Sequence, residues 1–409
     1  MRLLLLTDDA SPAARGGAGR IVLMLRGALA RRGHEVTLLT THQEKESAEK
    51  IWKDGDGRII SLYRQYPLRE RHRRCLGDPA FSALLERHIR ALRPDAVNAH
   101  NIHTYMSYDS LGIARLCTDR VFLTAHDTFL VSFHRVHQDG YLRAALENKG
   151  YTMRWREHLH DAGRRYWPFR NRSIRSALRN VRTIIAISKA LESFLHANGI
   201  GNTTVIPNGI EETSPPLPAD IRQFRERHAL SGPVVFFAGR ISEEKGIRVL
   251  LTAMEQVIAT LPKAVLLIAG DRQRLESHLS IASGRLRAAI RTTGWIDQDA
   301  MRVAHAASTL FVTPSLYLDN FPTVNLDAMA AGKPVVGTIF GGTPEAVEDG
   351  ETGFIVDPRN TAALANALLR LLRDPALAQK MGKAGEERVH DAFTIERQAE
   401  CYLRLFNTP

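Results

Sequence analysis

The feature that most constrains the fold is an alternation of short apolar runs with helix-like segments along most of the chain. The segment at 18–32 places Ile21, Leu25 and Leu29 on one helical face and stops at Gly33. Strands that alternate with helices build a parallel sheet covered by those helices. The sequence therefore predicts an α/β fold, with strands at 2–6, 36–40, 95–100, 121–126, 183–188, 204–207, 234–238, 265–269, 310–313 and 334–337.

The alternation is interrupted at 211–220 by a polar stretch that contains Pro215, Pro216 and Pro218. Such segments are typical of linkers, and 409 residues are too many for one ordinary core. We therefore expect two Rossmann-like domains, at 1–210 and 211–385, which face each other across a deep cleft at the carboxyl ends of their strands. The last segment, 386–409, is expected to be helical, and its return to the first domain is left open.

Composition excludes several classes of protein. Apolar residues make up 44% of the chain and charged residues 24%, as in ordinary globular proteins. No apolar run reaches the ~18 residues of a membrane span, and the opening leucines meet Asp8 and Asp9 too soon for a signal peptide. Cys75, Cys117 and Cys401 are scattered and odd in number, which favours the reducing cytoplasm over a disulfide framework.

The net charge of +11 indicates an anionic partner, which can be nucleic acid, a membrane face or a phosphate-bearing small molecule. The basic residues are concentrated at 139–182 and in the run Arg69, Arg71, Arg73 and Arg74. Two interpretations stay open for 139–182: a patch for the anionic inner face of a membrane, or a solvated helix pair with an aromatic core stripe. The aromatic residues among its arginines are Tyr151, Trp155, Tyr166, Trp167 and Phe169.

Two glycine-containing segments are candidates for binding phosphate. Gly16 and Gly17 follow the first strand and open a helix, where glycine lets the backbone approach an anion closely. A flexible strand-to-helix turn is the alternative there. The loop at 239–246 follows a later strand and presents Arg240 and Lys245, which can clamp a diphosphate.

A third candidate segment runs from Pro314 to Gly332. Pro322 suits the first position of a helix that Gly332 ends, so the first turn would offer backbone N–H groups to a phosphate. Asp319 precedes this helix and Asp327 lies within it, and carboxylates accept hydrogen bonds from neighbouring sugar hydroxyls. The alternatives are a helix-cap acid at Asp319 and a surface charge at Asp327.

A histidine and a pair of acids complete the candidates. His126 closes the strand at 121–126, where it faces the ligand edge of the sheet and can orient a hydroxyl. The histidines around it lack the cysteine or acid spacing of a metal site. Asp54 and Asp56 form an acid-x-acid motif of a kind that holds divalent metals, but they lie in a polar loop at 53–58. No metal and no cofactor are expected.

Together these segments resemble the retaining glycosyltransferases of family 4, which have the GT-B fold. The resemblance covers nearly the whole chain and is strongest at 205–210, at 238–246 and from Pro314 to Gly353. It implies a first domain on the acceptor side and a second that binds a nucleotide sugar. It also implies metal-independent transfer from a UDP- or GDP-sugar to a saccharide or lipid-linked acceptor, in cell-surface polysaccharide or glycolipid synthesis.

The resemblance also implies roles for single residues. His126, Arg240, Lys245 and Asp319 would be catalytic, with His126 against the transferred sugar. Asp319 and Asp327 occupy both glutamate positions of the family's E-x7-E motif, so each carboxylate is withdrawn by about 1.5 Å unless the backbone shifts. The donor-binding residues implied are Gly16, Gly17, Gly239, Arg240, Lys245, Asp319, Asn320, Phe321, Pro322, Thr323, Val324 and Asp327.

Two other classes of protein stay open at this point. A sugar-nucleotide epimerase shares the two-domain architecture and needs acids placed for proton abstraction, but no acceptor. A basic nucleic-acid-binding protein would explain the positive charge. It leaves the loop at 239–246 and the acids Asp319 and Asp327 unexplained, so no nucleic-acid partner is expected.

Overall fold

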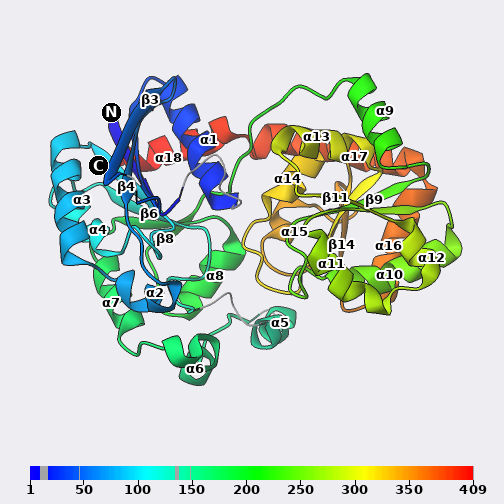
Figure 1. Ribbon diagram of the computed structural model, residues 1–409, viewed down its shortest axis with the longest axis horizontal. Coiled ribbons are helices and arrows are strands. Elements are labelled where there is room, and N and C mark those ends of the chain that lie inside the picture. The colour runs from blue at the N-terminus through cyan, green and yellow to red at the C-terminus, as the bar shows by residue number, and fades with distance from the viewer. Residues whose placement is uncertain (10–16, 46, 134–137, 148, 409) are drawn as a thin grey trace. The chain divides into compact units, whose positions relative to one another are not determined.

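The computed structural model describes residues 1–9, 17–45, 47–133, 138–147 and 149–408, which form two compact units (Figure 1). The first unit comprises Met1–Gly140, Ala144–Glu211 and Ile395–Pro409, and the second comprises Tyr141–Arg143 and Glu212–Thr394. Each unit is an α/β structure built on its own sheet, which confirms the predicted fold class. The functional division of the chain at 210/211 and 385/386 stays a prediction.

The sheet of the first unit has the strand order β3-β4-β2-β1-β5-β6-β7-β8. Its strand pairs are parallel except for β3 with β4. The chain leaves β1 toward β2 on one side and returns to β5 on the other, so β1 and β5 flank the topological switch point where open sheets bind ligands. The strands are β1 (Arg2–Thr7), β2 (Glu35–His42), β3 (Glu49–Asp54), β4 (Gly57–Tyr63), β5 (Ala96–His100), β6 (Val121–Ala125), β7 (Thr183–Ala186) and β8 (Thr203–Val205).

The sheet of the second unit has the order β11-β10-β9-β12-β13-β14 and is parallel throughout. The chain runs from β9 to β10 and β11 on one side and returns to β12 on the other. The switch point therefore lies between β9 and β12. The strands are β9 (Val234–Ala238), β10 (Val265–Ala269), β11 (Ile290–Gly294), β12 (Leu310–Thr313), β13 (Val335–Thr338) and β14 (Gly353–Val356).

Helices cover both sheets, which explains why the central strands are apolar on both faces. The principal helices are α1 (Gly17–Arg31), α3 (Pro79–Leu92), α4 (Asp109–Arg115), α5 (Gln138–Leu146), α6 (Trp155–Ala162), α7 (Arg170–Leu178), α8 (Lys189–Ala197), α9 (Pro218–Arg227), α10 (Ile247–Thr260), α13 (Gln298–Ala307), α14 (Thr323–Ala330), α15 (Thr343–Ala346), α16 (Thr361–Arg373), α17 (Pro375–Ala392) and α18 (Ile395–Phe406). No helix in the described part of the chain combines the length and apolar character needed to span a membrane.

The last helix, α18, completes the core of the first unit. It packs along α1, and Tyr402 and Phe406 are buried among Leu25, Leu29 and other core residues. Burying a large apolar side chain contributes about 2 kcal/mol, so α18 is a substantial part of this core. The segment 386–409, which was predicted to be helical, contains parts of two helices. It includes the end of α17, in the second unit, and all of α18, in the first.

Candidate active site

In the second unit, Lys245 and Asp319 meet at the switch point between β9 and β12. Lys245 stands on the loop after β9 and Asp319 on the loop after β12, with 2.6 Å between Lys245 Nζ and Asp319 Oδ2. Both side chains are largely shielded from solvent. Burial alone would lower the pKa of Lys245, but the neighbouring Asp319 and Tyr317 outweigh it and raise that pKa. Lys245 is therefore an ammonium at neutral pH.

Two glycines allow the loops that carry this pair to approach each other. Gly246 has a φ of +76°, and a Cβ there would lie 1.9 Å from the carbonyl oxygen of Pro314. Gly341 has a φ of +68°, and a Cβ there would lie 2.2 Å from the carbonyl oxygen of Asp319. Only glycine combines these dihedrals with such close contacts. Lys245 and Asp319 are thus held by backbone packing as well as by charge.

The helix after Asp319, α14, begins one residue later than predicted. Pro322 has an extended ψ of 101° and is the N-cap rather than the first helical residue, because the helical conformation starts at Thr323. Pro322, as the N-cap, makes no side-chain hydrogen bond to the first turn of α14. Asp327 is half-buried within the helix and is not a simple surface charge. Around the start of α14, Phe321 and Pro322 are buried, and Asn320, Thr323 and Val324 are half-buried.

The other described residues that were predicted to bind phosphate are divided between the two units. Gly239 adopts a φ of +139° at the end of β9, and Arg240 next to it is exposed on the same loop as Lys245. Gly17 is the exposed first residue of α1 in the first unit. Gly16 lies outside the described residues. The structure therefore brings Lys245 and Asp319 into contact, whereas Arg240 shares only their edge of the sheet.

In the first unit, His126 follows β6 and contacts His100 at the end of β5. His100 Nδ1 and His126 Nε2 are 2.9 Å apart, and the two rings are stacked with 5.3 Å between their centroids. Burial lowers the pKa of His126 to about 4, even though neighbouring Asp127 acts in the opposite direction. Burial also lowers the pKa of His100 well below its ordinary value. Both imidazoles are therefore neutral at physiological pH.

The acid-x-acid motif forms the turn of a hairpin, not the polar loop that was predicted. Asp54 ends β3, and buried Arg26 donates hydrogen bonds to both oxygens of its carboxylate. These bonds hold the pKa of Asp54 below its ordinary value. The N–H of Asp56 donates to Asp54 as well, at 2.9 Å. Across the described ranges, no group of three or more histidine, cysteine or acidic side chains is arranged to hold a metal ion.

Three contacts of the candidate residues were not predicted. Ser315 Oγ donates to Asp319 Oδ2 at 3.1 Å, and Lys245 Nζ lies 5.1 Å from the centroid of the Tyr317 ring. Both residues share the loop that carries Asp319, which is the signal that would have found them. His100 ends the strand adjacent to the strand that precedes His126. The strand at 95–100 was predicted, but the contact of His100 with His126 depends on the pairing of β5 with β6.

Comparison with known proteins gives a consistent result along the chain. Two family models match in succession, Glycosyltransferase Family 4 at residues 15–214 and Glycosyl transferases group 1 at residues 220–388. The GDP-mannose-dependent monoacylated alpha-(1-6)-phosphatidylinositol monomannoside mannosyltransferase of Corynebacterium glutamicum is 30% identical, over 61% of this chain and 68% of its own length.

Two solved structures resemble both units over almost their entire lengths. Sucrose-phosphate synthase from Thermosynechococcus elongatus has a TM-score of 0.76 at 24% identity, over 99% of this chain and 98% of its own. Anabaena HepE, solved in complex with UDP and glucose, has a TM-score of 0.69 at 19% identity, again over 99% and 98% of the two chains. At these identities the likeness establishes the fold alone.

Proposed function

The chain belongs to glycosyltransferase family 4 and has the GT-B fold, and from that premise we propose that it moves a sugar from a nucleoside diphosphate donor to an acceptor hydroxyl. The relatives support the donor class, since the mannosyltransferase is named for GDP-mannose and HepE was solved with UDP. The diphosphate is common to both and the nucleoside differs. The name of the mannosyltransferase also supports a lipid-linked acceptor in glycolipid or cell-surface polysaccharide synthesis.

The observation that carries the proposal is the shielded Lys245–Asp319 pair at the switch point between β9 and β12. Its two charges compensate each other, and each matches a different part of a nucleotide sugar. A diphosphate suits the ammonium, and sugar hydroxyls can donate hydrogen bonds to the carboxylate. The first turn of α14 adds backbone N–H groups near the same strand ends, where the helix dipole favours an anion.

In the proposed reaction the bond between the anomeric carbon and the diphosphate oxygen breaks, and a bond to the acceptor oxygen forms on the same face of the sugar. Negative charge grows on the leaving diphosphate, where Lys245 and Arg240 stabilise it. The proton of the acceptor hydroxyl passes to a phosphate oxygen of the leaving group. His126 contacts the transferred sugar as a neutral imidazole, and Asp327 contacts the ribose. Retention and the roles of His126 and Asp327 come from the family resemblance.

Family membership favours this function over the two alternatives. The epimerase hypothesis shares the fold, but the relative described above is named as a mannosyltransferase. The nucleic-acid hypothesis has no counterpart among the comparisons described above. The nucleic-acid alternative makes no use of the Lys245–Asp319 pair.

The proposal is tested by the melting temperature of the protein with UDP-, GDP- and ADP-sugars, in the presence of EDTA. Lys383→Ala is the matched control, because Lys383 is exposed on α17 and pairs only loosely with Glu387, at 3.7 Å. One class of donor should stabilise the wild type and Lys383→Ala by about 2.7 kcal/mol at a hundred times its Kd. Lys245→Ala should not respond. A full response of Lys245→Ala, or no response of the wild type to any donor, would contradict the proposal.

A further inference from the structure

The segment at 151–172 of the first unit exposes aromatic rings and cations together. Trp155 is 62% exposed and Phe169 is 61% exposed, and Leu159 and Trp167 are exposed as well. Trp155 and Leu159 are four residues apart on α6, so they share one helical face. Figure 1 shows α6 at the margin of the first unit, apart from the sheet. We call these four side chains and the exposed arginines of 151–172 the basic aromatic surface.

The acids of the same segment face inward. Glu157 accepts hydrogen bonds from the Tyr151 hydroxyl at 2.8 Å and from the Arg154 N–H at 2.6 Å. The Asp161 side chain is almost completely buried. The aromatic-core interpretation therefore fits Tyr151, which is buried, but is wrong for Trp155, Trp167 and Phe169. The exposed arginines of this surface are Arg154, Arg156, Arg164, Arg165 and Arg172.

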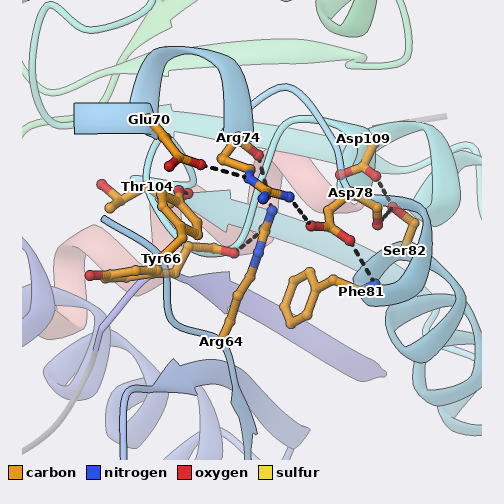
Figure 2. Close-up of polar contacts among 10 residues, drawn as sticks. Arg64, Tyr66, Glu70, Arg74, Asp78, Phe81, Ser82, Thr104 and Asp109 are labelled. Atoms are coloured by element: carbon orange, nitrogen blue, oxygen red, sulfur yellow. Dashed lines mark hydrogen bonds and ion pairs between the residues drawn. The ribbon is translucent and has the colours of Figure 1, made fainter. Parts of the chain in front are cut away.

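The other basic cluster of the first unit contrasts with this surface. Figure 2 shows Arg74 between two acids, with distances of 3.3 Å to Glu70 and 3.0 Å to Asp78. Arg64 is buried there and donates to the carbonyl oxygens of Arg74 and Tyr105. The charge of Arg74 is thus compensated by its acidic neighbours, and Arg64 holds loop backbone, whereas Arg69 and Arg73 of that cluster are exposed. The basic aromatic surface directs its charge outward.

We propose that the basic aromatic surface docks on an anionic membrane. Tryptophan and phenylalanine side chains insert favourably at the level of the lipid headgroups, and arginines beside them are attracted to anionic lipids. Nucleic acid would also attract the arginines, but it offers no apolar phase for an aliphatic side chain such as Leu159. The combination of exposed apolar side chains with outward cations therefore favours a lipid surface.

The inner side of the same segment holds the loop that follows His126. Asn171 Nδ2 donates to the carbonyl oxygen of Val131 at 2.8 Å, and the rings of Tyr166 and Phe133 lie 5.2 Å apart. Docking therefore brings the loop after His126 close to the lipid surface. If the proposed function holds, the acceptor is carried by a lipid in that surface. The docking itself does not depend on catalysis, so it can be tested separately.

The test is co-sedimentation of the full chain with vesicles, without any donor. Vesicles of phosphatidylcholine alone are compared with vesicles of equal parts phosphatidylcholine and phosphatidylglycerol. The wild type should bind the anionic vesicles, lose binding at high salt, and ignore the neutral ones. The triple variant Trp155→Ala/Trp167→Ala/Phe169→Ala should bind the anionic vesicles at least about tenfold more weakly, because it loses three exposed rings.

The matched control is Trp52→Ala/Trp295→Ala, since both tryptophans are exposed but lie outside this surface. It should bind like the wild type. Equal binding of the triple variant, equal binding to neutral vesicles, or preferential binding of single-stranded DNA by the same surface would overturn the proposal. Failure of the donor-dependent stabilisation described above would leave this result unchanged, so the two proposals can fail separately.

A second, independent observation is a hydrogen-bonded network of buried polar side chains that ends at His126. The Tyr402 hydroxyl lies 2.9 Å from Thr124 Oγ1, which donates to Asn98 Oδ1 at 3.2 Å. Asn98 Nδ2 lies 2.9 Å from His100 Nε2, and His100 Nδ1 lies 2.9 Å from His126 Nε2. All of these side chains are buried.

The hydrogen bonds among these side chains all run in one direction, and this direction determines the tautomers of His100 and His126. With the Asn98 amide oriented so that its Nδ2 faces His100, the amide nitrogen donates, His100 Nε2 accepts, and the single ring proton of neutral His100 lies on Nδ1. His100 then donates to His126 Nε2, which leaves the proton of neutral His126 on Nδ1. We infer that His100 is a positioning residue that holds His126 as the Nδ1–H tautomer. This inference deepens the proposed function, in which His126 contacts the sugar.

The tautomer is measured directly by the ¹⁵N chemical shifts of the histidine rings in the wild type, independently of activity. The wild type should show protonated Nδ1 and bare Nε2 for His126. His100→Ala should shift His126 toward the Nε2–H form and lower kcat by about tenfold with a smaller change in KM. His100→Gln, which can still donate, should restore part of both. An Nε2–H signal in the wild type, or an unchanged tautomer in His100→Ala, would overturn the inference whether or not the protein is active.

Discussion

The two units place different electrostatics at the carboxyl ends of their sheets. At the carboxyl ends of β9 and β12, Lys245 and Asp319 form a shielded pair of full charges. At the carboxyl ends of β5 and β6, His100 and His126 form a buried pair of neutral rings. A buried charge persists beside an opposite charge, whereas a buried imidazole without enough compensation loses its proton. The charged pair of the second unit suits the charged diphosphate of the proposed donor.

The largest effect is expected from Lys245→Ala, which breaks the charged pair. Asp319 would keep its contact with Ser315 but lose its cation, and removal of one partner of a buried pair costs about 3–5 kcal/mol. We expect a lower melting temperature and a decrease in kcat/KM of about 100-fold or more, since charge on the leaving group loses its stabilisation. Thermal denaturation and steady-state kinetics measure the two effects.

The double variant Lys245→Ala/Asp319→Ala separates stability from catalysis. It removes both charges, so the melting temperature should recover toward that of the wild type while activity stays lost. An equal loss of stability in the single and double variants would show that the pair is not electrostatically coupled. The contrast with the neutral histidines would then fail.

The next largest effect is expected on stability, from Gly246→Ala. The added Cβ would meet the carbonyl oxygen of Pro314, so the loops of Lys245 and Asp319 would have to separate. We expect a loss of about 3 kcal/mol or more in the free energy of unfolding, measured by urea denaturation. Gly350→Ala is the control, because Gly350 has a similar φ of +79° and a Cβ added there would meet nothing within 4 Å. It should lose only about 1 kcal/mol. Similar losses in both variants would show that loop packing does not support the charged pair.

Much of the fold could be predicted because buried parallel strands have a simple pattern. The run at 234–238 is apolar at every position, and all of β9 is buried. The strand β3 was not predicted, because it is an edge strand that pairs only with β4 and exposes Ile51 and Trp52. Its sequence sets two adjacent apolar residues between pairs of charged ones and has no buried face, so no core pattern marks it.

The candidate site could be predicted residue by residue but not as a set of contacts. Lys245 and Asp319 were each identified from the loop that follows a strand, yet they are 74 residues apart in sequence. Their contact depends on β12 returning to the side of β9. The contact of Tyr402 with Thr124 spans 278 residues and depends on α18 packing in the first unit. Local periodicity carries no information about either arrangement.

The neutral pair predicts a pH dependence of stability. The pKa of His126 is lowered from 6.5 to about 4, so between these values the unfolded state binds more protons than the folded state. Stability should therefore fall as the pH falls from 6.5 toward 4, by up to about 3 kcal/mol for this residue. Urea denaturation at pH 7 and pH 5 should show a smaller difference in His126→Gln than in the wild type. The pKa of His72, lowered to about 3, contributes in the same direction in both proteins. An undiminished difference in the variant would place the pH dependence elsewhere.

The smallest effect is expected from Asp319→Glu, which restores the residue of the family motif. The carboxylate already lies 2.6 Å from Lys245, and an added methylene displaces it by about 1.5 Å. Gly341 packs on the backbone of Asp319 and limits any compensating shift. The charges remain paired, so donor-dependent stabilisation should persist, and kcat should change by less than about tenfold, equivalent to about 1.4 kcal/mol. The measurement is a comparison of kcat and donor affinity with those of Lys245→Ala. A loss as large as that of Lys245→Ala would mean that the position of the carboxylate, rather than its charge, governs this edge of the sheet.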